Sequence, residues 1–297
     1  MNLSILIPCY NYYPLDLVKS LSDEIVRDRL DVEILLWDDA SKGAYGHKIE
    51  ALGRLPNVRH NRLSENLGRA KIRNAMVEEA NGEFLLFIDA DGIPVSSNFI
   101  SNYLGEISAN RVVCGGRIYQ KEPPTFKYYL HWKYGTQKES KTVEERSKRP
   151  YFGFHSNNFL IPKHVFGRIN FPEELVGYGH EDTLFGVLLK KGQIPVKHID
   201  NPVVHVGLEK REVFLDKAVT AGENLAMFIR LGHLEFKDTK LSKAYILLSK
   251  WKLMRLFLGW ATFRVSYWNR ELLTRNNPSL FMLNLYKLFF FSVEIRK

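Results

Sequence analysis

Two aspartates separated by one residue, Asp89 and Asp91, come directly after the apolar run from Phe84 to Ile88. Carboxylates at the end of a strand can be directed toward a hard divalent cation, which can in turn bridge two phosphate groups of a substrate. The pair also suits an ordinary turn, because Gly92 and Pro94 follow it. Since other acidic residues also follow predicted strands, we interpret Asp89 and Asp91 as candidate metal-site residues.

A second acidic pair, Glu181 and Asp182, follows Gly179 and His180 at the start of a predicted helix that ends near Lys191. Acids in the first turn of a helix complement its dipole, which is one interpretation of the pair. The other is catalysis, because a positioned carboxylate can remove the proton from a hydroxyl group that acts as a nucleophile.

His205 lies in the strand-like segment from Pro202 to Val206. A histidine in such a segment can be a core residue with satisfied hydrogen bonds or a metal ligand. A neutral imidazole added to a carboxylate site suits manganese, which accepts mixed oxygen and nitrogen ligands.

A sheet must position these residues, because buried-type apolar runs alternate with helix-like stretches over the first hundred residues. The pattern predicts strands at Leu3 to Pro8, Val32 to Trp37 and Phe84 to Ile88, and helices at Leu15 to Val26 and Arg69 to Ala80. This alternation predicts an α/β fold with a mainly parallel, doubly wound sheet flanked by helices.

Ligands of such sheets bind beyond the carboxyl ends of the strands. Polar residues follow three of the predicted strands: Tyr10 and Asn11, Asp38 and Asp39, and Asp89 and Asp91. These three strand ends are expected to face one crevice.

Four segments together resemble a known family. The segments Ser4 to Asn11, Glu33 to Ser41, Glu65 to Asp91 and Gly177 to Gly192 look like the successive motifs of family 2 glycosyltransferases, which have the GT-A fold, a Rossmann-like sheet. The last segment also resembles the Gly-x-Gly-x-Glu-Asp region of galactosyl- and N-acetylgalactosaminyltransferases. The resemblance covers roughly Met1 to Gly207, and the order of four motifs makes it more specific than any one of them.

The resemblance implies a nucleotide-sugar site. Pro8, Tyr10 and Asp39 would contact the nucleotide base and ribose. The loop and helix that line the donor pocket would contribute Asn66, Gly68 and Arg73. One departure affects the turn after the second strand, where Trp37-Asp38-Asp39-Ala40-Ser41 replaces the more usual Asp-Asp-Gly-Ser of the family.

The resemblance also implies the catalytic and metal-binding roles. Asp89 would hold the ribose or sugar side and contribute to the metal site, Asp91 would bind the metal, and His205 matches a late histidine that completes the metal site in some relatives. Asp182 would be the base that deprotonates the acceptor hydroxyl, and Glu181 would contact the acceptor or donor sugar.

The predicted activity is therefore Mn²⁺- or Mg²⁺-dependent, inverting transfer of a sugar from a UDP-sugar to a hydroxyl group of a glycan, in cell-surface polysaccharide biosynthesis. A nucleotidyltransferase is an alternative, but it should show a Gly-rich, basic phosphate-binding loop near the first strand, and Pro8 to Asn11 is not one. A catalytically silent glycan- or membrane-binding module is the other alternative. The presence of every expected acidic residue argues against it.

The chain has 297 residues and a net charge of +9, and its charge is unevenly distributed. Residues 240–297 contain 11 Lys and Arg against two acidic residues, whereas residues 1–239 are neutral overall. We therefore predict a catalytic domain at 1–239 and a basic, aromatic-rich helical extension at 240–297. Basic residues interrupt its apolar stretches too often for a membrane-spanning helix of about 20 apolar residues.

The helical extension has two interpretations: helices packed on the catalytic domain, or a helix that lies in a membrane interface. Trp251, Trp260, Tyr267 and Trp268 beside the excess cations favour an anionic membrane surface, and also suit a lipid-linked glycan acceptor. Nucleic-acid binding ranks lower, because no recognised motif accompanies the charge.

The cellular location is predicted from cysteine usage and the N-terminus. Only Cys9 and Cys114 occur, and no signal-like segment precedes the first strand. We expect a cytoplasmic protein, peripheral at the inner face of the cytoplasmic membrane.

Overall fold

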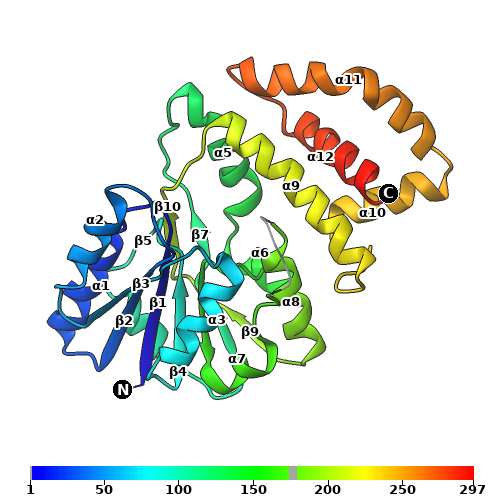
Figure 1. Ribbon diagram of the computed structural model, residues 1–297. Coiled ribbons are helices and arrows are strands. Elements are labelled where there is room, and N and C mark those ends of the chain that lie inside the picture. The colour runs from blue at the N-terminus through cyan, green and yellow to red at the C-terminus, as the bar shows by residue number, and fades with distance from the viewer. Residues whose placement is uncertain (1, 174–178) are drawn as a thin grey trace. The chain divides into compact units, whose positions relative to one another are not determined.

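The computed structural model describes residues 2–173 and 179–297 (Figure 1). Residues 177 and 178, which open the Gly-x-Gly-x-Glu-Asp segment, lie outside the described residues. The chain forms two compact units. The first unit comprises Met1–Gln120, Glu139–Val176 and Leu188–Gly207, and the second comprises Lys121–Lys138, Gly177–Val187 and Leu208–Lys297. The compositional boundary predicted between residues 239 and 240 differs from this division and stays a prediction.

A seven-stranded sheet with the order β3-β2-β1-β4-β8-β6-β9 forms the centre of the first unit. Its strands, in chain order, are β1 (Leu3–Cys9), β2 (Val32–Asp38), β3 (Val58–Arg62), β4 (Phe84–Ile88), β6 (Val112–Cys114), β8 (Asn158–Pro162) and β9 (Val196–His198). β8 pairs antiparallel with β4 and β6, and the other neighbours are parallel. The predicted mainly parallel α/β sheet is confirmed.

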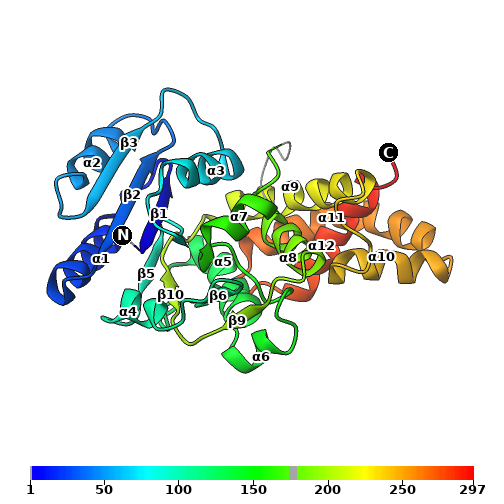
Figure 2. The same cartoon turned by 90° about the horizontal axis from the view of Figure 1, so that it is seen from below.

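Helices cover both faces of this sheet (Figure 2). Leu17, Val18 and Leu21 of α1 (Leu15–Asp28) pack into the core with alternate residues of β1 such as Ile5. α3 (Arg69–Glu79) also contacts β1 and β2. The other helices of the first unit are α2 (Tyr45–Leu52), α4 (Phe99–Leu104), α6 (Val143–Ser147) and α7 (Lys163–Ile169). Strands buried on both faces explain the continuous apolar runs of the sequence.

A smaller three-stranded sheet joins distant segments of the first unit. β10 (Val203–His205) lies between β5 (Gly92–Pro94), with which it is antiparallel, and β7 (Arg117–Ile118), with which it is parallel. Because β5 begins three residues after Asp89, this sheet extends from the end of β4.

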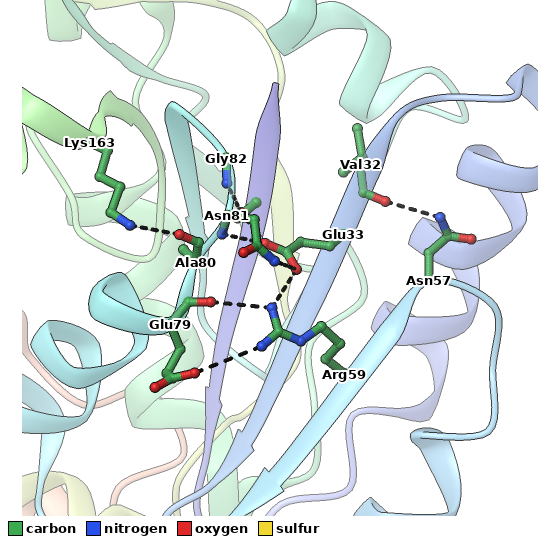
Figure 3. A network of polar contacts seen from close by, with 10 residues as sticks. Val32, Glu33, Asn57, Arg59, Glu79, Ala80, Asn81, Gly82 and Lys163 are labelled. Carbon is green, nitrogen blue, oxygen red and sulfur yellow. Dashed lines mark hydrogen bonds and ion pairs between the residues drawn. The ribbon is translucent and has the colours of Figure 1, made fainter. Parts of the chain in front are cut away.

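A polar network closes the amino edge of the large sheet, where β1, β2 and β4 begin (Figure 3). Glu33 is buried, and its carboxylate accepts hydrogen bonds from Ser4 Oγ at 2.6 Å and Arg59 Nη1 at 2.8 Å. Asn81 donates to it from N at 2.7 Å and from Nδ2 at 3.0 Å. Burial raises the pKa of Glu33, but these hydrogen bonds outweigh it and lower the pKa overall. A Cβ on Gly82 would meet the backbone N of Ser4 at 2.5 Å, so the chain approaches β1 here as only glycine allows.

The second unit is helical. α9 (Arg211–Arg230) packs against α12 (Leu280–Glu294), and α11 (Met254–Thr274) also packs against α12 (Figure 1). The unit also contains α5 (Tyr129–Tyr134), α10 (Lys240–Lys250), the first part of α8 (Glu181–Lys191), a single turn at Phe126–Tyr128, and the turn at Gly135–Glu139 except its last residue. Its core includes Leu215 of α9, Ala261 and Trp268 of α11, and Leu283 of α12. The predicted C-terminal helices are confirmed.

Crossing a bilayer requires a helix with both sufficient length and sufficient hydropathy. No helix of the described residues has both.

Candidate active site

Asp91 and His205 lie side by side although 113 residues separate them in the chain. β5 and β10 pair so that Gly92 stands opposite His205, and Val206 N donates to Asp91 O at 2.9 Å. This ladder brings His205 Nδ1 to 3.3 Å from Asp91 Oδ1. The small sheet therefore positions two of the three predicted metal ligands.

The surroundings of Asp91 keep its carboxylate ionised and leave room around it. Burial alone raises its pKa, but the hydrogen bond and charge of His205, together with Arg69 and Arg117, outweigh burial and lower the pKa from 3.8 to about 2. A Cβ on Gly207 would meet Asp91 Oδ2 at 2.0 Å, so the chain passes this close to the carboxylate only because residue 207 is glycine. The Asp91 side chain remains 26% exposed.

A second layer of residues holds His205. The Tyr119 ring contacts the imidazole edge to face, with ring centroids 5.2 Å apart. The Tyr119 hydroxyl donates to Glu139, whose Oε2 lies 3.3 Å from Arg117 Nη2. These residues were not predicted from the sequence. Arg117 and Tyr119 follow the Gly115-Gly116 pair. That pair was the one sign in the sequence that the chain changes direction near these residues.

Asp89 has a different partner. Its Oδ1 accepts a hydrogen bond from Arg73 Nη2 at 2.6 Å, and the Arg73 side chain is 3% exposed. The Arg73 guanidinium also lies 5.4 Å from the centroid of the Phe171 ring. Arg73 thus fixes the Asp89 carboxylate, and the structure joins these two predicted site residues to each other.

The donor chemistry at Asp91 and His205 fits a divalent metal that is shared with a substrate. Among the described residues, no group of three or more His, Cys, Asp and Glu side chains is arranged to hold a metal ion. Mg²⁺ and similar hard ions usually take one or two carboxylates from the protein and complete their shell with waters and substrate phosphates. A carboxylate beside an imidazole also suits Mn²⁺.

Asp39 organises the loop that leads into α3. Its two carboxylate oxygens accept hydrogen bonds from Leu67 N at 2.7 Å and Gly68 N at 3.0 Å, and Asn66 Nδ2 donates to its carbonyl at 3.1 Å. These hydrogen bonds lower the pKa of Asp39, but burial outweighs them and raises the pKa overall. The structure thus brings together the predicted residues Asp39, Asn66 and Gly68. The predicted contact of Asp39 with the nucleotide base and ribose stays a prediction.

The turn that departs from the family pattern adopts a conformation that favours glycine. Ala40 has a φ of 59°, in the left-handed region. Asp38 Oδ1 accepts from Ser41 N at 2.8 Å, and Ser41 Oγ accepts from Asn11 N at 2.7 Å. These bonds tie the loop after β1 to the loop after β2.

The remaining predicted residues of the first unit lie at the end of β1. Pro8 is half-buried in the strand, and Tyr10 follows it with 44% of its side chain exposed. An exposed ring at the carboxyl edge of a parallel sheet is available to stack on a planar ligand.

Glu181 and Asp182 lie in the second unit, in the first turn of α8. His180, with a φ of 70°, accepts a hydrogen bond from Leu184 N at 2.9 Å and so starts the helix. Glu181 Oε2 accepts from Gly179 N at 3.1 Å, whereas Oε1 is buried and finds no hydrogen-bond partner among the described residues. Burial, with the charge of Lys287, lowers the pKa of His180 to about 4, so a neutral imidazole precedes the acidic pair.

Comparison with known proteins gave a family match and similar folds. The family model described as glycosyl transferase family 2 matches residues 4–169. No curated protein sequence matches the chain. A mannosyltransferase from Pyrobaculum calidifontis, solved with GDP-Man and Mn²⁺, is 15% identical with a TM-score of 0.59, over 99% of this chain and 87% of its own.

Two further solved structures share the fold. Glucosyl-3-phosphoglycerate synthase from Mycobacterium tuberculosis, solved with Mg²⁺ and UDP, is 15% identical with a TM-score of 0.52, over 77% of this chain and 78% of its own. TarS 1-349 from S. aureus, solved with UDP-GlcNAc, is 19% identical with a TM-score of 0.50, over 76% of this chain and 66% of its own. At these identities the likeness shows the GT-A fold alone.

Proposed function

Because the chain belongs to glycosyl transferase family 2, we propose that it transfers a sugar from a UDP-sugar to a hydroxyl group of a glycan, with inversion at the anomeric carbon. The observation that carries the proposal is the Asp91–His205 pair, 3.3 Å apart at the carboxyl edge of the sheet. The solved structures named above that contain GDP-Man, UDP-GlcNAc or UDP support a nucleotide-sugar donor.

Asp91 and His205 would hold Mn²⁺ or Mg²⁺, with Asp89 beside them. When bound, the metal supplies positive charge that neutralises the leaving diphosphate. Arg73 holds the Asp89 carboxylate, and Asp39 keeps the loop of Asn66 and Gly68 in one conformation. Tyr10 and Pro8 would line the base side of the donor.

Asp182 would take the proton from the attacking hydroxyl group, and Glu181 would contact the acceptor or the donor sugar. The buried Oε1 of Glu181, without a partner among the described residues, supports a contact with a hydroxyl group of a ligand. Deprotonation at the moment of attack allows a single displacement from the face opposite the leaving diphosphate. We further propose that the acceptor is a lipid-linked glycan of cell-surface polysaccharide synthesis, used on the cytoplasmic side.

The experiment is sugar transfer by Asp182→Asn, or slow donor hydrolysis if no acceptor is known. Turnover should fall by roughly 10²–10⁴-fold, the usual contribution of a general base, while UDP affinity stays the same. Glu212→Gln is a matched control, because Glu212 is also a first-turn helix acid of the second unit. Near-normal transfer by Asp182→Asn would contradict its role as base, and lost UDP affinity would place it in donor binding instead.

A further inference from the structure

Large apolar side chains are exposed to solvent on one face of α11. Leu256, Trp260, Phe263 and Tyr267 are 71%, 47%, 88% and 38% exposed. Their spacing of four, three and four residues places them along one side of a helix with 3.6 residues per turn. We call these four residues the Trp260 face.

The Trp260 face is distinct from the side of α11 that packs into the second unit. The buried residues of the helix are Met254, Ala261, Trp268 and Leu272, which follow a stripe of their own. The Trp260 ring contacts the buried Trp268 ring, with centroids 5.1 Å apart. α11 therefore has two apolar sides, and its own core covers one of them.

Exposed apolar side chains are concentrated in the segment of the chain that contains this face. Eight of the twenty large hydrophobic residues that are exposed in the described chain lie between residues 246 and 267. The four outside the Trp260 face are Ile246, Leu247, Trp251 and Leu253. Scattered single apolar residues are normal on a protein surface, but a row of them along one side of a helix, as in the Trp260 face, marks an interaction site.

The charge around the face is almost entirely positive. Residues 240–275 contain eight Lys and Arg and one acidic residue, Glu271, which pairs with Arg275 at 2.9 Å. The guanidinium groups of Arg264 and Arg270 lie 5.8 Å and 5.9 Å from the centroid of the Tyr267 ring. Exposed Trp and Tyr rings bordered by cations combine the two groups that an anionic membrane interface accommodates.

We propose that the Trp260 face lies in the interface of an anionic lipid membrane, with its cations at the level of the headgroups. A second copy of the chain fits this surface less well. In a twofold dimer the same patch faces itself, so excess cations would oppose cations. Anionic lipid instead complements the charge and buries the apolar rings. The inference goes beyond sugar transfer, because it requires neither donor nor acceptor.

The test is sedimentation of the full-length protein with vesicles of phosphatidylcholine mixed with phosphatidylglycerol, or of phosphatidylcholine alone. Binding should require the anionic lipid and weaken as salt screens the charges. Trp260→Gln with Phe263→Gln should weaken binding by about tenfold or more, because two rings no longer leave water. Arg255→Gln with Arg264→Gln should also weaken it about tenfold, because each cation near an anionic surface contributes.

Leu231→Gln is the matched control, since Leu231 is 59% exposed in the second unit but lies outside residues 246–267. It should bind vesicles as the unchanged protein does. All substituted side chains are exposed, so unfolding curves should coincide and exclude misfolding as a cause. Equal vesicle binding by the Trp260/Phe263 variant, or no anionic binding by the unchanged protein, would overturn the proposal. If the unchanged protein dimerises without binding vesicles, and the Trp260/Phe263 variant is monomeric, the proposal would be overturned and the face would bind a second copy of the chain.

Discussion

The two edges of the large sheet both carry buried or partly buried carboxylates, but they use them differently. At the amino edge, Glu33 accepts four hydrogen bonds from Ser4, Arg59 and Asn81, and its side chain is 4% exposed. At the carboxyl edge, Asp91 interacts with His205 and is 26% exposed. An acid that neighbouring groups fully satisfy stabilises the fold, whereas an ionised acid that stays accessible can bind a ligand.

The largest effect on stability is expected at the amino edge. Glu33→Ala removes the acceptor of four hydrogen bonds, so the buried donor groups of Ser4 and Asn81 lose their acceptor. The free energy of unfolding should therefore fall by about 3–5 kcal/mol. Donor affinity per folded molecule should stay unchanged. Denaturant unfolding would measure the loss, with Glu50→Ala as an exposed-acid control. A loss below about 1 kcal/mol would show that the network contributes little.

The far end of the carboxyl edge provides a second test. Its polar groups are hydrogen-bonded to one another, as those of the amino edge are. Arg146 donates to the carbonyls of Cys114, Gly115 and Ile199, and to His198 Nδ1 at 2.8 Å. Arg146 has no acceptor, so His198 carries its proton on Nε2, which donates to Pro150 O at 2.9 Å. Burial is the main reason that the pKa of His198 falls to about 4.

Unfolded His198 takes up a proton below about pH 6.5, whereas folded His198 does so only below about pH 4. Unfolding is therefore favoured as the pH falls through this window, by up to about 3 kcal/mol. His198→Gln should remove this part of the pH dependence. Denaturant unfolding at pH 7 and pH 4 would test it, and the same slope in both proteins would refute the assignment.

The smallest effect is expected at Ala40, in the turn of the carboxyl edge that departs from the family pattern. Glycine adopts a φ of 59° without the steric cost that Ala40 bears. Ala40→Gly should raise the free energy of unfolding by about 1 kcal/mol. A lower stability in thermal and denaturant unfolding would mean that the turn is not strained.

Local patterns predicted the sheet, but not the partners of its polar residues. The apolar runs of β1, β2 and β4 placed Asp39, Asp89 and Asp91 correctly after strands, whereas Asp38 is the last residue of β2. Burial on both faces leaves a continuous signal in the sequence. The significance of Glu33 was missed, although an acid inside the apolar run of β2 was the available signal.

Pairings over long chain separations required either the family resemblance or the structure. The proximity of His205 to Asp91 depends on the small sheet, whose strands are two or three residues long and leave no periodic signal. The bonds from Leu67 and Gly68 to Asp39 come from backbone groups, which carry no residue-specific pattern. The assignment of Asp182 and Glu181 stays a prediction.

Sugar transfer as proposed requires that the metal and the nucleotide meet at Asp91 and His205. Calorimetric titration of UDP, with and without Mn²⁺, tests it directly on the unchanged protein, Asp91→Ala and the exposed-acid control Asp16→Ala. Mn²⁺ should strengthen UDP binding by the unchanged protein and by Asp16→Ala, while Asp91→Ala should lose this Mn²⁺-dependent gain and still unfold cooperatively. Unchanged, metal-dependent UDP affinity in a folded Asp91→Ala protein would contradict the account.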